Sequence, residues 1–441
     1  MSLLKQPQAR ALLADAMVSE SLVRGCAEHL SAFLQRYLPV FDRKEQREHA
    51  VRIVQGRLSG LERKTTEPIA IQAGQHRKPL QNFVGAASWD DETLMAQIRQ
   101  HVRDELADPK AVLVLDSSGF PKKGTESCGV DRQWCGRLGK VDNCQVGVFL
   151  VYAARGGNAP LGRQLYLGKT WAGDAERRRR CHVPAAVTFQ EKWQIGVALV
   201  NQAADLPHGW VAADDEFGRI TAFRRQLRQR RHCYVLDVPA STWVRDLEAR
   251  VRRRPGQVRR DRKPPFERVD EWAARQPQAR WRKLLVRDGE KGPLEVEALG
   301  VTVHTKADSR ICTDEERLLV IRTRDAQPEV SFALCHADRG VPVAELVRVK
   351  LQRHRIEEVF AQAKGEVGLG HYEVRSWVGW HHHMTLSLLA LWFLVLERHR
   401  LGGKNPGRHG RSGAPDRDPL APSPGSRAGR HRARDQSRAA A

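Results

Sequence analysis

Residues 111–124 have the sequence AVLVLDSSGFPKKG, and from this stretch we predict the fold. A run of apolar residues leads directly into Asp116, which is followed by two serines, a glycine and a proline. An apolar run bounded by turn-forming residues is typical of a buried strand that ends in a turn. The sequence therefore predicts a carboxylate at the end of a central strand, where a sheet stops and a functional site can begin.

Two later stretches also place an acid on a predicted element. Within residues 209–218 (GWVAADDEFG), Trp210–Ala213 predict a short strand that leads to Asp214. Residues 353–364 (RHRIEEVFAQAK) predict a helix that carries Glu357. A single Asp after a strand is most often a turn residue or a helix cap. The three acids are therefore informative only as a set.

As a set, Asp116, Asp214 and Glu357 have the chemistry of a magnesium site. Mg²⁺ prefers carboxylate oxygens. Two such ions about 3.5–4 Å apart can serve the attacking and the leaving oxygen of a phosphodiester. We therefore expect these acids to bind metal and to cut and rejoin DNA. Asp215 and Glu358 stand beside two of them and remain open as alternatives.

The charge of the chain points to a polyanionic partner. Its 441 residues include 74 Lys and Arg against 52 Asp and Glu, a formal net charge of +22. Such an excess favours nucleic acid as the partner. No apolar stretch approaches the roughly 20 residues of a membrane helix. The N-terminal residues also lack a signal-peptide hydrophobic region. We expect a cytoplasmic, nucleoid-associated protein without membrane contact.

The eight cysteines do not predict a metal site. None of them forms a CxxC pair, which argues against structural zinc. Cys128, Cys135 and Cys144 lie near one another in the sequence, but their spacing matches no ordinary zinc pattern. We expect most of the cysteines to be reduced and buried.

Periodicity divides the chain into five parts. Residues 1–108 predict a helical N-terminal domain, which either binds DNA or caps the core. Residues 109–238 alternate strand and helix, which implies parallel pairing in the first part of an α/β catalytic core. Residues 239–338 predict a β-rich insertion, and residues 339–400 the C-terminal helices of the core. Residues 401–441 lack the apolar content for a core and predict a disordered basic tail.

Spacing also predicts residues that contact DNA. Arg353, Glu357 and Lys364 stand four and then seven residues apart, which places them on one face of a helix. Arg353 and Lys364 would then face DNA phosphates, although an i,i+4 surface pair between Arg353 and Glu357 is the alternative. Arginines 177–180 are expected in a loop. The predicted DNA contacts are Arg353, Lys364, Lys122, Lys123, Arg178, Arg179 and Lys350.

Two groups of residues near the C-terminal helices are weaker candidates for DNA contact or metal binding. Trp377 and Trp380 follow the predicted helix of Glu357, and we single them out for DNA contact although tryptophans are more often in the core. Residues 381–383 are three histidines. Consecutive helical side chains point in different directions, so a structural or DNA-facing role is favoured over metal binding.

Together these motifs resemble the DDE transposases of bacterial insertion sequences, specifically the branch with a β-strand insertion before the last acid. The helix motif of that family is Tyr, two residues, Arg, three residues, Glu, six residues, Lys. Arg353, Glu357 and Lys364 fit these positions, whereas Lys350 stands where the family has Tyr. The surroundings of Asp116 and Asp214 match the family's LDSSGFPKKG-like and ADxxYG-like stretches. Phe217 stands in place of the Tyr of the ADxxYG-like stretch.

The resemblance implies an RNase H-like mixed sheet with a helical N-terminal domain and a β-rich insertion. It implies that Asp116, Asp214 and Glu357 are the catalytic residues and bind two Mg²⁺ ions, for which Mn²⁺ can substitute. It further implies binding to double-stranded DNA, both transposon ends with terminal inverted repeats and target DNA. Strand cleavage and strand transfer by a homodimer in a synaptic complex would follow.

Two other functions remain open from the sequence. One is a catalytically impaired transposase derivative that binds DNA without cutting, which Lys350 and the unusual tail favour. We hypothesise that the tail is a frameshifted or degenerate C-terminus. The other is an RNase H-like nuclease without strand transfer.

Overall fold

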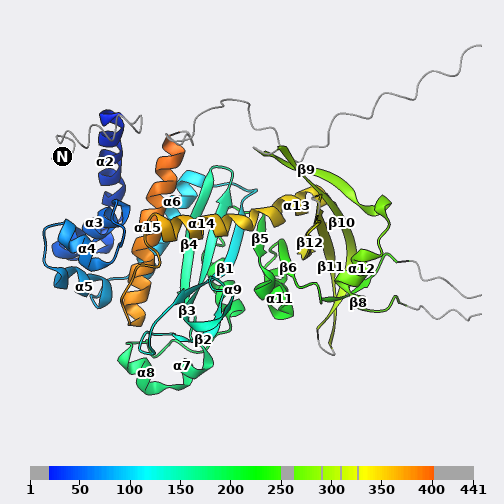
Figure 1. The fold of residues 1–441 in the computed structure, drawn as a ribbon, viewed down its shortest axis with the longest axis horizontal. Coiled ribbons are helices and arrows are strands. Elements are labelled where there is room, and N and C mark those ends of the chain that lie inside the picture. Colours follow the sequence, from blue (N-terminus) through cyan, green and yellow to red (C-terminus); the bar gives the residue numbers. More distant parts are fainter. Residues whose placement is uncertain (1–18, 250–262, 290–291, 308–309, 325–326, 402–441) are drawn as a thin grey trace, which may run out of the picture.

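Strand β1 (Val112–Pro121) is the centre of the fold in the computed structural model. It pairs antiparallel with β3 (Lys140–Ala154), which in turn pairs antiparallel with β4 (Gly157–Leu165). On its other side it pairs parallel with β5 (Trp210–Ala213), and β5 pairs parallel with β6 (Tyr234–Val238). The strand order is β4-β3-β1-β5-β6 (Figure 1). The parallel pairing predicted from alternating strands and helices is confirmed.

The structure describes residues 19–249, 263–289, 292–307, 310–324 and 327–401. The predicted tail from residue 402 onward therefore lies outside the described residues. Residues 250–262, an arginine-rich part of the predicted β-rich insertion, also lie outside them.

Helices cover both faces of the central sheet. On one face lie α14 (His354–Gly365) and α15 (Trp377–Arg400), because Phe149 of β3 contacts Phe360 and Trp380. On the other lies α9 (Lys192–Gln202), since Gly162 of β4 leaves room for Leu199. Asp116 stands opposite Phe149 in the register, so its side chain points to the face that α14 covers.

The N-terminal helices surround α15. They are α2 (Glu20–Gln35), α3 (Lys44–Leu58), α4 (Thr66–Gln72), α5 (Arg77–Gly85) and α6 (Asp91–Leu106). Helices α2, α3, α5 and α6 contact α15, which lies between the first three and the sheet, whereas α6 also contacts β4 directly (Figure 1). Most residues of α15 are consequently buried, including the apolar run of residues 388–393 in its middle. Among the described helices, none is long and apolar enough to cross a membrane.

The predicted β-rich region extends the same sheet. Strand β12 pairs antiparallel with β6, and the order continues β12-β11-β10-β7-β8, with β9 paired to β10. All of them belong to one 12-stranded mixed sheet, so the α/β fold class is confirmed. The division into domains at residues 239 and 338 stays a prediction. The elements of this region are β7 (Trp243–Asp246), β8 (Glu267–Arg268), α12 (Val269–Ala274), η3 (Gln278–Arg280), β9 (Arg282–Gly289), β10 (Gly292–Ala307), β11 (Arg310–Thr323) and β12 (Val330–His336).

The remaining elements connect these layers. The four arginines expected in a loop form a short helix instead, capped by the carboxylate of Asp174. The connecting elements are η2 (Leu38–Val40), β2 (Asp131–Cys135), α7 (Lys169–Gly173), α8 (Ala175–Arg180), α10 (Asp215–Gly218), α11 (Thr221–Gln229) and α13 (Val343–Gln352).

A buried ion pair joins the core to the extended part of the sheet. Arg224 of α11 donates from Nε to both carboxylate oxygens of Glu316 on β11, at 3.0 and 3.2 Å. Tyr234 Oη donates to the same carboxylate at 2.6 Å. Both charged side chains are almost fully buried. Removal of one partner would leave a buried charge without its counterion.

We expect Glu316→Ala to lower the free energy of unfolding by about 3–5 kcal/mol, because the buried Arg224 guanidinium loses its carboxylate. Glu315→Ala is the matched control, since the neighbouring Glu315 side chain is more than half exposed and pairs only loosely with Arg339. It should change stability by less than about 0.5 kcal/mol. Urea unfolding followed by circular dichroism measures both. Equal losses in the two variants would contradict the role assigned to the buried pair.

Candidate active site

Two of the predicted acids lie side by side on adjacent parallel strands. Leu115 of β1 pairs with Ala213 of β5, so Asp116 and Asp214 are the next residues along each strand. The prediction that Asp116 ends its strand is wrong, because β1 continues to Pro121 along β3. Only β5 stops at this level, and Asp214 then caps α10 by accepting from the Glu216 amide at 3.1 Å.

Burial and mutual repulsion disfavour the charged form of both carboxylates. Burial, and then the charge of Asp214, raises the pKa of Asp116 to about 8, although the Ser117 amide donates to its Oδ1 at 2.6 Å. Burial, and then the charges of Glu216 and Asp215, raises the pKa of Asp214 to about 6. The protein thus places two acids where an added positive charge would be strongly favoured.

The positive charge of Arg353 opposes the rise in the pKa of both acids. A break between two helices lies at this residue, which is the C-cap of α13 and the N-cap of α14. Its Nε lies 3.1 Å from Asp237 and one terminal nitrogen lies 3.0 Å from Glu357. Burial acts to lower the pKa of the guanidinium, but surrounding charges raise it overall. Those charges are on Asp237, Glu357, Asp116 and Asp214.

Glu357 interacts with Asp116 and Asp214 indirectly, through the charge of Arg353. Its carboxylate forms an ion pair with Arg353 at 3.0 Å and lies 2.9 Å from His354 Nδ1, and its side chain is 45% exposed. This is the i,i+4 pair that the sequence left open as the alternative. Within the residues that the structure describes, no group of three or more His, Cys, Asp or Glu side chains is placed to hold a metal ion. The structure therefore brings Asp116 and Asp214 together and joins Glu357 to them electrostatically.

A third carboxylate in the row was missed from the sequence. Leu236 of β6 pairs with Ala213, so Asp237 continues the row that begins with Asp116 and Asp214. Its signal was the same as that of Asp116, an apolar run directly before an Asp. Asp237 pairs with Lys350 as well as with Arg353.

This pairing places Lys350 inside the protein. Only 9% of the residue is exposed, and its ammonium donates to the Asp237 carboxylate. A DNA phosphate at the surface would not reach it in this arrangement, in contrast to the expectation from the sequence.

Glu216 is a second residue that sequence reasoning missed. It accepts hydrogen bonds from Ser117 Oγ at 2.6 Å and from Lys192 Nζ at 2.5 Å. Glu216 thus links Ser117, the residue after Asp116, to Lys192, the first residue of α9. Its place in the stretch ADDEFG was the available signal.

The other predicted DNA contacts differ in their exposure. Lys123 and Arg179 are exposed. Lys122 is half-buried with its ammonium 3.4 Å from the ring centre of Tyr372. Arg178 donates to the Val187 carbonyl at 2.6 Å, so it also supports the local fold. Lys364 is half-buried beside Phe120 and Phe360.

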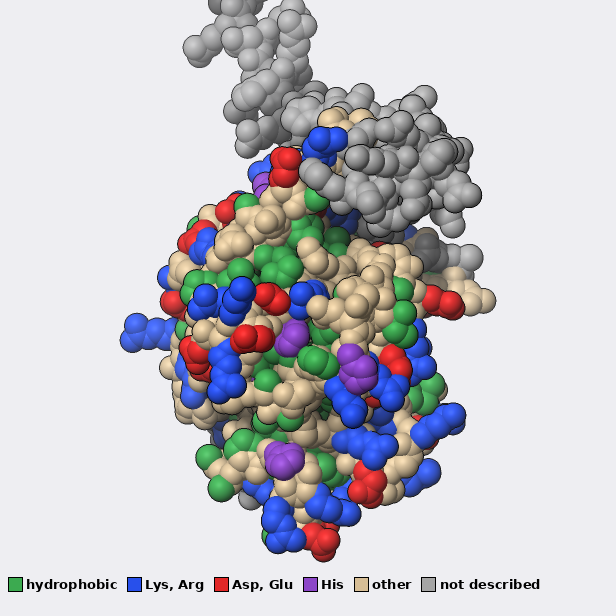
Figure 2. Space-filling model, turned by 90° about the vertical axis from the view of Figure 1, so that its left-hand side faces the viewer, with side chains coloured by type: hydrophobic (Ala, Val, Ile, Leu, Met, Phe, Trp, Pro, Cys, Tyr) green, Lys and Arg blue, Asp and Glu red, His purple; other side chains and the backbone are tan. Residues whose placement is uncertain are grey.

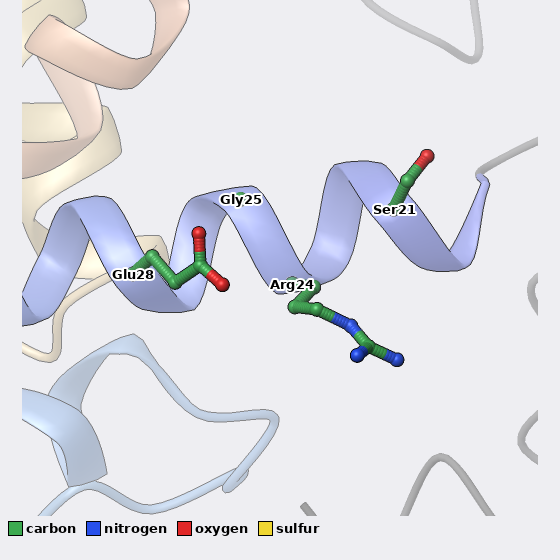
Figure 3. Close-up of a pocket in the computed structure, with 4 residues that line it drawn as sticks. All are labelled: Ser21, Arg24, Gly25 and Glu28. Atoms are coloured by element: carbon green, nitrogen blue, oxygen red, sulfur yellow. The ribbon is translucent and has the colours of Figure 1, made fainter.

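One face of the molecule shows where positive charge gathers (Figure 2). Lys and Arg side chains are dense in its lower half, at the level of α5, α7 and α8 in Figure 1, with Asp and Glu interspersed. A surface hollow on α2, lined by Ser21, Arg24, Gly25 and Glu28 (Figure 3), is formed by one side of a single helix. Among the residues that the structure describes, it brings together no groups from other elements.

The three histidines and two tryptophans of α15 are buried. His382 Nε2 lies 3.1 Å from the Trp89 carbonyl oxygen and His383 Nε2 lies 2.9 Å from that of Leu369. Burial lowers the pKa of all three imidazoles. Trp377 and Trp380 are also buried, so they have the core position that is more common for tryptophan and not the DNA contact for which they were singled out.

Comparison with known proteins agrees with this geometry. The family model described as DDE superfamily endonuclease matches residues 36–293, more than half of the chain. The chain belongs to this family. A second model, described as Transposase DDE domain, matches residues 194–393. Asp116 lies in the first range, Glu357 in the second and Asp214 in both. The central strand order is accordingly that of an RNase H-like fold, as expected.

One relative is similar over part of the chain. It is described as a probable transposase for insertion sequence element IS701 from Microchaete diplosiphon. The identity is 28% over 155 residues, which cover 35% of this chain and 41% of that protein. The matched region thus spans less than half of the relative.

The raised pKa values predict an unusual dependence of stability on pH. In the unfolded chain both acids titrate near pH 4. The folded chain holds their protons to about pH 6 and 8, so it binds more protons than the unfolded chain in this interval. Stability contributed by these acids therefore falls as pH rises from 4 to 8.

Asp116→Asn should remove most of this loss in buffer containing EDTA. We expect the variant to gain stability over the wild type as pH rises from 5 to 8, on the order of 1–3 kcal/mol. Urea unfolding at both pH values measures the gain. Asp215→Asn is the control, because Asp215 is exposed to solvent and pairs with Arg219. The account fails if the advantage of Asp116→Asn is the same at the two pH values.

Proposed function

We propose that this protein is a transposase that binds terminal inverted repeats and catalyses metal-dependent strand cleavage and strand transfer. The observation that carries the proposal is the pair of half-buried, adjacent carboxylates Asp116 and Asp214 in a chain of the DDE superfamily endonuclease family. With Glu357 they would form the catalytic set. The net charge of +22 supports double-stranded DNA, both transposon ends and target, as the partner.

The donor set suits two Mg²⁺ ions, with Mn²⁺ able to substitute. Both Asp116 and Asp214 offer hard oxygen ligands, and their raised pKa values show that the site favours added positive charge. Glu357 would complete the ligands by leaving its pair with Arg353. Bound metal ions supply activation of the attacking water or 3′-hydroxyl and stabilise charge on the leaving oxygen.

The chain's own residues would position DNA and balance charge around this site. Asp214 is oriented by the Glu216 amide and Asp116 by the Ser117 amide. Arg353 balances the surrounding acids. We propose that exposed Lys123 and Arg179, together with Lys364, contact phosphates. A homodimer in the synaptic complex and nucleoid association complete the proposal.

Two observations favour a catalytically impaired, DNA-binding derivative as the second candidate. The Glu357 carboxylate is engaged by Arg353 and His354. In addition, Lys350 is buried at the position where the family motif has Tyr. A nuclease that cuts but never joins is distinguished by a strand-transfer assay.

Alanine variants test the catalytic set. Asp116→Ala, Asp214→Ala and Glu357→Ala should each reduce Mg²⁺-dependent cleavage by about a thousand-fold, since each would remove metal-based stabilisation worth several kcal/mol. The substrate is a duplex that carries the inverted repeat flanking this gene. Asp215→Ala and Glu358→Ala are matched neighbours and should cut within about three-fold of the wild type. Normal cleavage by Asp214→Ala with loss in Asp215→Ala would exchange the two roles.

Metal binding has a readout that needs no DNA. We expect about 5 mM Mg²⁺ or Mn²⁺ to raise the melting temperature of the wild type by a few degrees. Asp116→Asn and Asp214→Asn should lose this rise, because the ligand oxygens and their charge are removed. Differential scanning fluorimetry measures it, with Na⁺ at equal ionic strength as the control. An unchanged rise in both variants would place the metal elsewhere.

A further inference from the structure

The β2–β3 hairpin presents apolar side chains to solvent beside the site. Trp134 of β2 is 58% exposed and stands directly opposite Val141 of β3, which is 51% exposed. Leu138 in the turn between them is 42% exposed. A cluster of exposed large apolar residues on a well-ordered hairpin is typical of a contact surface.

The same hairpin is basic. Arg132 stands two residues before Trp134 on β2 and therefore shares its face of the hairpin. Arg137 and Lys140 flank Leu138 at the turn, and all three cations are exposed. An aromatic platform surrounded by Arg and Lys is the combination that binds unpaired bases and their phosphates.

The inner face of the hairpin fixes its position relative to the carboxylates. Gly119 stands three residues after Asp116 on β1, and a Cβ on it would lie 2.8 Å from Cys135 Sγ. Cys135 is buried next to Trp134, so this close contact anchors the strand that carries the indole.

Lys364 provides a second link between hairpin and site. Burial lowers its pKa, the charge of Arg137 lowers it further, and the charge of Asp116 raises it. Lys364 is therefore within electrostatic range of both the hairpin turn and the first catalytic carboxylate.

We infer that Trp134 stacks on an unpaired DNA base next to the strand held at Asp116 and Asp214, with Arg132 and Arg137 on the flanking phosphates. This inference rests on the proposed function, for which it names a contact on the DNA. A second copy of this chain fits the surface less well, because it would bring an equal basic hairpin or another part of a chain with charge +22 against these arginines.

Stacking requires a base that has left the duplex, whereas phosphate contacts do not. The indole should therefore add affinity only for DNA that offers an unpaired base. The arginines should add affinity for any DNA, in a salt-dependent way. These two dependences separate the role of Trp134 from a general loss of binding.

The test uses the full chain and two 20-bp duplexes of one arbitrary sequence, one blunt and one with a three-nucleotide overhang containing 2-aminopurine, a size suited to an ordinary DNA site. We expect Trp134→Ala to bind the overhang duplex about ten-fold more weakly and to lose quenching of the 2-aminopurine. Its affinity for the blunt duplex should stay within about two-fold. Trp134→Phe should retain most of the affinity and the quenching.

Salt titration and a matched tryptophan provide the controls. Trp134→Ala should keep the wild-type slope of log K against log salt, whereas Arg132→Ala and Arg137→Ala should each reduce that slope by about 0.7–0.9. Trp243→Ala removes another exposed tryptophan, on β7, and should leave binding of both duplexes unchanged. Circular dichroism confirms that each variant is folded.

Three outcomes would overturn the inference. They are unchanged overhang binding by Trp134→Ala, equal losses on both duplexes, and a change in oligomeric state by sedimentation, which would make the hairpin an interface between copies. Because this test measures binding and not cleavage, its result can be distinguished from the results of the Asp116, Asp214 and Glu357 variants. A wild type that cuts DNA while Trp134→Ala binds normally would refute the stacking alone. Quenching that depends on Trp134 without any cleavage would refute the transposase activity alone.

Discussion

The parallel register of β1, β5 and β6 places three carboxylates in one row, and the rest of the site depends on how their charge is balanced. Asp237, at one end of the row, pairs with Lys350 and Arg353. Asp116 and Asp214 have no such direct pair among their described contacts, and burial with mutual repulsion raises their pKa values. The row thus contains one neutralised carboxylate and two that favour an added cation. This difference separates Asp237, whose charge is balanced by two ion pairs, from Asp116 and Asp214, the two acids that we propose bind metal.

Asp237 also gives a physical reason for the departure at position 350. The Asp237 carboxylate is half-buried, and a charge that is partly withdrawn from water is stabilised by a partner of opposite charge. Lys350 supplies that partner from the last turn of α13, one turn before Arg353. A tyrosine at this position could donate a hydrogen bond to Asp237 but could not neutralise it, which would leave Arg353 as its sole cation among these residues. The Lys350–Asp237 pair therefore leaves more of the positive charge of Arg353 for the acids on its other side.

Much of the fold was predictable because local pattern and long-range pairing agree. The apolar runs before Asp116 and Asp214 gave the central strands, and β5 begins and ends where the sequence predicts. The extension of β1 beyond Asp116 was not predictable, since polar Ser117 and Ser118 are strand residues only through pairing with β3. The break at Arg353, the burial of Lys350 and the burial of Trp380 likewise depend on which helix face meets the sheet. Periodicity identifies a face but not its partner.

The break at Arg353 has a consequence for how charge is communicated across the site. Arg353 shares its guanidinium between Asp237 on the sheet and Glu357 one turn into α14, and it also interacts with Asp116 and Asp214. The interactions compete, because a single positive charge balances four acids. When positive charge is added at Asp116 and Asp214, these acids attract Arg353 less strongly. The Arg353 side chain is then held less firmly between the helix and the sheet. Glu357, half exposed and at the start of its helix, is the acid freest to change partners in response. Lys350, Arg353 and Glu357 are spaced three and four residues apart around the helix break. Through Arg353, the charges of Asp116 and Asp214 are thus coupled to that of Glu357, even where the carboxylates do not touch.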